Sequence, residues 1–121
     1  AMIRFYERHV CRLLPWPQEL LDNMKRSKHA IYGFMWGASE FTVTGTLQDF
    51  DVTDRLKEIV IPSLFTCGNF DEATPKTTEY YASLVPGSEF HIFENSSHMP
   101  GVEEPEAYAT RVREFLNNQS K

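Results

Sequence analysis

An aspartate and a histidine occupy positions where the sequence pattern predicts chemistry. Asp71 follows an apolar run that ends at Gly68, and His98 follows an alternating segment that ends at Glu94. Because neighbouring parallel strands end at the same edge of a sheet, we expect both side chains at that edge. An aspartate that accepts from one imidazole nitrogen leaves the other nitrogen to act as general base for a hydroxyl nucleophile. From spacing alone, a polar loop aspartate and a surface histidine are the commoner explanation.

Two glutamates are candidates for binding a cationic group. Glu72 follows Asp71 directly, and Glu40 lies between Ser39 and Phe41 after an aromatic run. Carboxylates in an apolar setting hold an amine by charge-assisted hydrogen bonds. For Glu40, an acid that faces solvent at a helix end or in a loop is the favoured alternative.

The sequence shows no complete motif for a nucleophile, a phosphate or a metal. A serine nucleophile on a strand-to-helix turn requires G-x-S-x-G, but segment 37–41 has Phe41 at the last position. We therefore expect no nucleophile in this chain. The glycine motifs that bind phosphates are missing, and the four histidines lack metal-ligand spacing. No metal and no cofactor is expected.

The second half of the sequence predicts alternating strands and helices that would position these residues. The pattern first predicts a short helix over 54–59. It then predicts a strand over 60–68, a helix over 75–85, a strand over 88–94 and a helix over about 104–117. Thr74 is the expected N-cap of the first long helix, with Pro75 as its first residue. The final helix places Tyr108, Val112, Phe115 and Leu116 on one face. This order predicts an α/β fold with two parallel strands and flanking helices.

The first half is less regular. Apolar spacing predicts a helix within 2–14 and a second one from about 16 to 26. Residues 29–36 are apolar on all sides, so helix and strand both stay open. Residues 42–46 are predicted to be extended because they are rich in β-branched side chains.

The composition fits one small domain. The 121 residues are 41% hydrophobic and 24% charged, which excludes a disordered tail, a collagen-like chain and a disulfide scaffold. A net charge of -5 makes nucleic acids and anionic membranes poor partners. No apolar run reaches the roughly 18 residues of a membrane span. The two cysteines lack CxxC spacing, so we expect a cytoplasmic protein with reduced thiols.

Several motifs occur in an order that resembles one enzyme family. They are His-Val-Cys-Arg at 9–12, Trp-Gly-Ala-Ser-Glu-Phe at 36–41, Gly-Thr-Leu at 45–47, Gly-Asn-Phe-Asp-Glu-Ala-Thr-Pro at 68–75 and Ser-Ser-His-Met at 96–99. Together they resemble the C-terminal third of proline iminopeptidases, which are serine peptidases of the α/β-hydrolase superfamily. The resemblance extends over nearly the whole chain, and the second and third motifs are its most specific parts.

This resemblance implies a role for each candidate residue. Asp71 looks like the triad acid and His98 like the triad base, while Glu72 and Glu40 look like the acids that hold the free α-amino group of a peptide. Residues 1–50 resemble the end of a helical cap domain, and residues 51–121 the C-terminal part of the α/β-hydrolase core. The complete enzyme would release N-terminal proline from peptides.

The missing nucleophile and oxyanion loop make this chain look like a fragment without activity of its own. A base and an orienting acid without a nucleophile cannot carry out acyl transfer. The expected partner is the missing N-terminal half or a second copy, because the 13% aromatic residues and the open strand edges need cover. Two alternatives stay open: a non-catalytic module that self-associates or binds a partner, and a different α/β-hydrolase such as an esterase.

Overall fold

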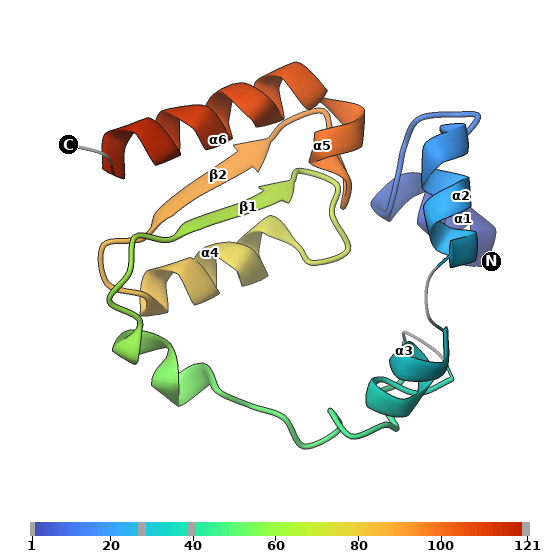
Figure 1. Cartoon of the computed structure of the whole chain (residues 1–121), viewed down its shortest axis with the longest axis horizontal. Helices are drawn as coiled ribbons and strands as arrows, with labels where there is room; N and C mark the ends of the chain where they lie inside the picture. The colour runs from blue at the N-terminus through green and yellow to red at the C-terminus, as the bar shows by residue number, and fades with distance from the viewer. Residues whose placement is uncertain (1, 27–28, 39–40, 120–121) are drawn as a thin grey trace. The chain divides into compact units, whose positions relative to one another are not determined.

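The chain divides into two compact units, one formed by residues 1–16 with 53–121 and the other by residues 17–52. The computed structural model describes residues 2–26, 29–38 and 41–119, without the side chain of residue 29. The elements shown in Figure 1 are α1 (Met2–His9), α2 (Gln18–Arg26), α3 (His29–Met35), the 3-10 helix η1 (Thr53–Glu58), β1 (Leu64–Gly68), α4 (Pro75–Leu84), β2 (Glu89–Phe93), α5 (Pro100–Glu103) and α6 (Pro105–Gln119).

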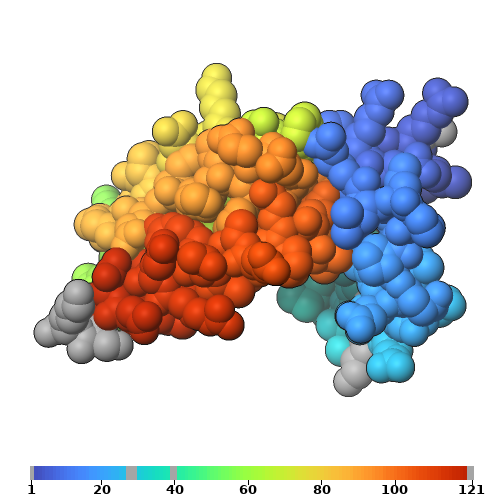
Figure 2. All heavy atoms as spheres, turned by 90° about the horizontal axis from the view of Figure 1, so that it is seen from above, coloured from blue at the N-terminus to red at the C-terminus, as the bar shows by residue number. Residues whose placement is uncertain are grey.

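A pair of parallel strands forms the centre of the first unit. β1 pairs with β2 from Leu64 opposite Glu89 to Gly68 opposite Phe93. In Figure 1, α4 and α6 lie on opposite sides of this pair, and Figure 2 shows the segment around β2 and α5 between them from above. The predicted α/β arrangement of strand, helix, parallel strand and helix is therefore confirmed. It brings the loops after β1 and β2 to the same end of the sheet.

The helix that connects the strands begins as the sequence predicts. The Thr74 side chain caps α4 by accepting a hydrogen bond from the Thr77 amide, and Pro75 occupies the first turn. α4 ends at Leu84, and Gly87 follows with a φ of 71°, a left-handed conformation that glycine adopts at little cost. This turn leads the chain directly into β2.

The first strand is shorter than predicted. The sequence pattern indicates a strand over 60–68, but β1 begins at Leu64. Val60 and Ile61 are 91% and 69% exposed, so their apolar side chains do not lie in a sheet. Pro62 has no N–H to donate, and the pairing with β2 starts only at Leu64. A segment rich in β-branched residues forms no regular strand where no partner strand pairs with it.

Two further details differ from the prediction at the C-terminal end. Residues 100–103 form the short helix α5, which lies before the predicted start of the last helix at about residue 104. Pro100 suits the first turn of a helix, which explains the extra turn. On α6, Tyr108 packs against Phe93 with ring centroids 5.5 Å apart, but Leu116 is exposed.

The second unit, residues 17–52, is mainly helical. α2 matches its prediction, and the ambiguous segment 29–36 is helical as α3. The segment predicted to be extended forms no regular strand within 41–52; it holds an isolated bridge at Thr42. The Thr44 and Gly45 amides donate to the Trp36 carbonyl instead, at 2.8 and 2.9 Å. The assignment of residues 1–50 to a cap domain stays a prediction; residues 2–16 lie in the first unit.

The apolar core within the described residues is small. Its buried members are Cys11, Leu20, Cys67, Ala82, Val85 and Phe93. Many larger apolar side chains are exposed, among them Phe34, Phe50 and Ile61. Exposed apolar area on this scale marks surfaces that bind something else.

Gly68 lies where β1 meets the loop after β2. A Cβ atom at Gly68 would be 2.2 Å from the Ser97 carbonyl oxygen and 2.3 Å from that of Ser96. Both are backbone atoms, so neither moves away without displacing the loop.

We therefore expect Gly68→Ala to lower the free energy of unfolding by about 3 kcal/mol. Urea denaturation followed by circular dichroism measures it. Gly101→Ala is the matched control, since its Cβ would meet only the Tyr108 ring at 3.5 Å or more. The control should stay within about 0.5 kcal/mol of the parent. Equal effects of both substitutions would contradict this role of Gly68.

Candidate active site

Hydrogen bonds hold the two loops at the strand ends together. The Asn69 amide donates to the Phe93 carbonyl at 2.9 Å, and the Phe70 amide donates to the Ser96 carbonyl at 3.0 Å. Both bonds continue from the parallel pairing of β1 and β2. The loop that carries Asp71 and the loop that carries His98 are thus fixed side by side.

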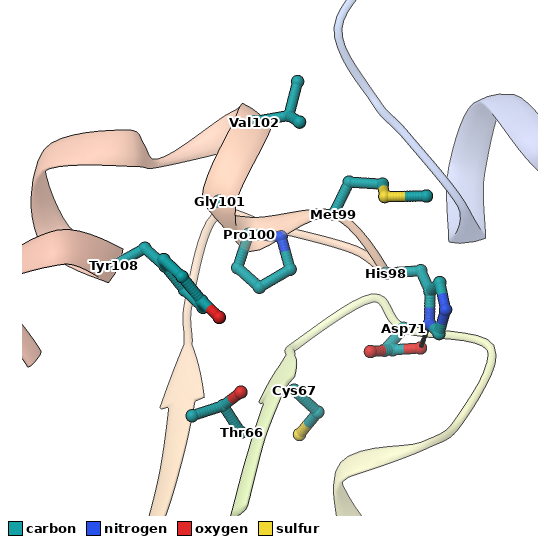
Figure 3. A pocket seen from close by; sticks show the side chains of 9 residues that line it. All are labelled: Thr66, Cys67, Asp71, His98, Met99, Pro100, Gly101, Val102 and Tyr108. Atoms are coloured by element: carbon teal, nitrogen blue, oxygen red, sulfur yellow. Dashed lines mark hydrogen bonds and ion pairs between the residues drawn. The ribbon is translucent and has the colours of Figure 1, made fainter. Parts of the chain in front are cut away.

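Asp71 and His98 meet at this edge. His98 Nδ1 donates to Asp71 Oδ1 at 2.9 Å, drawn as a dashed line in Figure 3. The Asp71 side chain is only 5% exposed, and it also accepts from the Ala73 amide at 2.8 Å and the Gly68 amide at 3.4 Å. The His98 side chain is 44% exposed. Since Nδ1 faces the aspartate, Nε2 is the ring nitrogen left for a proton transfer, which is the arrangement of a general base with its orienting acid.

His9 ties the two loops together, a contribution that the sequence analysis missed. Its backbone carbonyl accepts from the Glu72 amide at 3.3 Å and from the His98 amide at 3.2 Å. Its imidazole Nδ1 donates to the Phe70 carbonyl at 2.8 Å. These are contacts between segments some 60 to 90 residues apart, and the only hint in the sequence is the motif at 9–12.

A cavity of about 310 Å³ adjoins the Asp71–His98 pair. Figure 3 shows its lining residues, which are Thr66, Cys67, Asp71, His98, Met99, Pro100, Gly101, Val102 and Tyr108. Cys67 is free, but burial raises the pKa of its thiol and nearby Asp71 adds to this effect. A protonated, buried thiol is a poor nucleophile, so Cys67 does not take the place of a serine.

Comparisons with known proteins show what this chain is similar to. No protein-family model matches the chain. The chain is 54% identical over 120 residues to a proline iminopeptidase of Heyndrickxia coagulans, covering 98% of this chain and 42% of that protein. A proline iminopeptidase of Saccharolobus solfataricus is 38% identical over 114 residues, which is 93% of this chain and 37% of that protein. The chain is homologous to part of the proline iminopeptidases.

Solved structures show the same similarity. The crystal structure of proline iminopeptidase from Mycobacterium smegmatis matches with a TM-score of 0.89 and 39% identity, over 96% of this chain and 40% of that one. The crystal structure of VinJ matches with a TM-score of 0.88 and 39% identity, over 97% of this chain and 40% of that one. The chain therefore has the fold of part of an α/β-hydrolase and spans about two fifths of the proline iminopeptidases it matches.

The structure describes only one of the two glutamates that the resemblance to proline iminopeptidases suggests. Glu72 is exposed and follows Asp71 at the end of β1. Glu40 lies outside the described residues, as does Ser39.

Within residues 2–26, 29–38 and 41–119, no cluster of three or more histidine, cysteine, aspartate or glutamate side chains is placed to hold a metal ion. No helix in the same ranges is long and apolar enough to cross a membrane.

Glu104 anchors the beginning of the loop that carries His98. It accepts hydrogen bonds from the Ser96 hydroxyl and from the Asn95 amide, the latter at 3.1 Å. The Ser96 hydroxyl, with Asn95, lowers the pKa of Glu104 below its usual 4.5, against the opposing effect of burial. The sequence pattern placed Glu104 only at the start of the last helix. The polar residues just before this helix were the available signal for its role, because buried hydrogen-bond donors need acceptors.

We expect part of the acid sensitivity of this proline iminopeptidase homologue to come from Glu104. A carboxyl group with a lower pKa in the folded state stabilises the fold above its unfolded pKa and loses this effect as the pH falls through its folded pKa. The free energy of unfolding should thus fall from about pH 5 downward, and less steeply in Glu104→Gln. Urea denaturation at a series of pH values measures both slopes. Glu106→Gln, an exposed neighbour on α6, should keep the parent slope, and an unchanged slope in Glu104→Gln would contradict the assignment.

Proposed function

We propose that this chain supplies the acid and the base of a proline iminopeptidase-like serine hydrolase that releases N-terminal proline from peptides. The observation that carries the proposal is the 2.9 Å contact between His98 Nδ1 and Asp71 Oδ1 at the ends of two parallel strands. The names of the relatives, of which the first is 54% identical, support the substrate class.

In the proposed reaction, His98 moves the protons and Asp71 holds it in place. Nε2 of His98 takes the proton of a serine hydroxyl as that oxygen attacks the carbonyl carbon of the N-terminal proline. Asp71 stabilises the imidazolium that forms. The imidazolium then gives its proton to the leaving amine, which leaves an acyl-enzyme that water hydrolyses with His98 again as base.

The serine of this reaction lies outside the 121 residues, because they contain no G-x-S-x-G. The relatives are more than twice as long as the part that this chain matches, so their remaining length is the proposed source of the nucleophile and the oxyanion donors. The proposed partner is that missing part or a second copy of this chain. A cytoplasmic location stays a prediction.

Glu72 and Glu40 are the proposed ligands of the substrate's N-terminal amine. Glu72 is adjacent to Asp71, at the same end of the sheet as the base. A carboxylate there would pair with a protonated secondary amine and reject peptides with a blocked N-terminus. Glu40 follows only from the resemblance.

The proposal predicts that the chain by itself does not hydrolyse proline arylamides, and that a chimera does. In the chimera this chain replaces the matching 120 residues of the Heyndrickxia coagulans relative. We expect His98→Ala in the chimera to lower kcat by about 10³-fold or more, because the base is lost. Initial rates of arylamine release measure it.

His91→Gln, on the neighbouring strand β2, is the matched histidine control and should keep most of the chimera's activity. A folded chimera without peptidase activity would contradict the proposed function. Robust activity of the chain alone that disappears in His98→Ala would refute the need for an outside nucleophile.

A second prediction concerns recognition of the amine. In the same chimera, Glu72→Gln should raise KM for proline arylamide by about tenfold with a smaller change in kcat, since it removes a charge-assisted bond to the substrate. Glu79→Gln, an exposed acid on α4, is the control. Equal KM values for all three proteins would exclude Glu72 from amine binding.

Exposed apolar side chains favour one other candidate function, a module that self-associates or binds a partner. Val60, Ile61 and Phe34 are all more than two thirds exposed. We expect the isolated chain to elute as a dimer or larger species in size-exclusion chromatography with light scattering, because such surfaces bury one another. A monomer at all concentrations would contradict this expectation.

A further inference from the structure

The Glu103 carboxylate receives hydrogen bonds from the residues on both sides of His98. Its Oε2 accepts from the Ser97 amide at 2.9 Å and from the Met99 amide at 3.2 Å. The Ser97 hydroxyl donates to the same carboxylate at 2.9 Å, and the Arg12 amide donates to Oε1 at 2.8 Å. One side chain thus accepts from three residues, two of which flank the proposed base.

Burial makes these bonds costly to lose. Ser97 is fully buried, so its hydroxyl has no water to replace the carboxylate. Hydrogen bonds to an ionised acceptor are stronger than neutral ones, and an unpaired buried donor is destabilising. A neutral amide in place of Glu103 would keep one acceptor oxygen and turn an NH₂ group toward the remaining donors.

Together with His9, Glu103 holds three consecutive backbone amides. The amides of Ser97 and Met99 bond to Glu103, and the His98 amide between them bonds to the His9 carbonyl at 3.2 Å. The backbone of the proposed base is therefore fixed from two sides. With the backbone held at this place, Nδ1 of the imidazole lies 2.9 Å from Asp71 Oδ1.

We propose that Glu103 is a positioning residue that keeps the His98 imidazole in the orientation in which Nδ1 faces Asp71. The proposal concerns the geometry of this chain and rests on the proposed function only for its consequence in catalysis. Glu104 has a different place, because it bonds to Asn95 and Ser96 at the start of the loop and not to the neighbours of His98.

Nitrogen-15 NMR of the whole chain tests the proposal without any enzyme assay. The ring nitrogen shifts of neutral His98 report which nitrogen carries the proton. We expect the Nδ1–H form in the parent and a mixture of both tautomers in Glu103→Gln. Hydrogen exchange at the Ser97 and Met99 amides should become about tenfold faster in the variant.

The amide of Cys67 in β1 and the variant Glu106→Gln are the controls, and both should behave as in the parent. Glu103→Asp keeps the charge but is one methylene shorter, so it should give an intermediate tautomer mixture; it replaces Glu103→Gln if that variant does not fold. A merely structural role would speed exchange over the whole unit and leave the tautomer of the folded protein unchanged.

The outcomes separate this proposal from the proposed function. An unchanged His98 tautomer in a folded Glu103 variant overturns the positioning role. Loss of the Nδ1–H form in that variant supports it, even where the chimera with the Heyndrickxia coagulans relative is inactive. If the chimera is inactive while His98 of the parent chain has the Nδ1–H form, only the peptidase proposal is overturned.

Discussion

The close approach at Gly68 is the constraint on which the rest of the site depends. β1 ends against the carbonyls of Ser96 and Ser97, with no room for a side chain between them. The amides that follow Gly68 then continue the pairing with the loop after β2. Asp71 and His98 each lie a few residues beyond this point, so their 2.9 Å contact is a consequence of how two backbones meet.

Polar contacts, more than apolar packing, hold this region in place. Asp71, Ser96 and Ser97 are buried, whereas the apolar core of the described residues contains a single aromatic side chain, Phe93. The acceptors that satisfy the buried donors come from side chains of Asp71, Glu103 and Glu104 and from the His9 backbone. For Glu104, whose pKa is lowered by the hydrogen bond from Ser96, this links the start of the loop that carries His98 to pH.

The sequence predicted those parts that depend on local chemistry. The Thr74 cap with Pro75 predicted the start of α4, the alternation in 88–94 predicted β2, and parallel topology predicted that Asp71 and His98 approach each other. The beginning of β1 could not be predicted, because it depends on where the partner strand starts. The contacts of His9 could not be predicted, because they join segments some 60 to 90 residues apart. The bonds of Glu103 to Ser97 and Met99 could not be predicted either, because they depend on how the loop after β2 folds back against α5. Family resemblance supplied the proposed substrate class.

The proposed general base and its orienting acid, His98 and Asp71, lie in direct contact. A proton spectrum edited for nitrogen-15 tests this contact, because a ring proton shared with a carboxylate resonates far downfield of the backbone amides. We expect one such resonance, bonded to Nδ1 of His98, that disappears in Asp71→Ala. A His98 ring that exchanges freely with solvent and shows the same spectrum with and without the Asp71 carboxylate would contradict it.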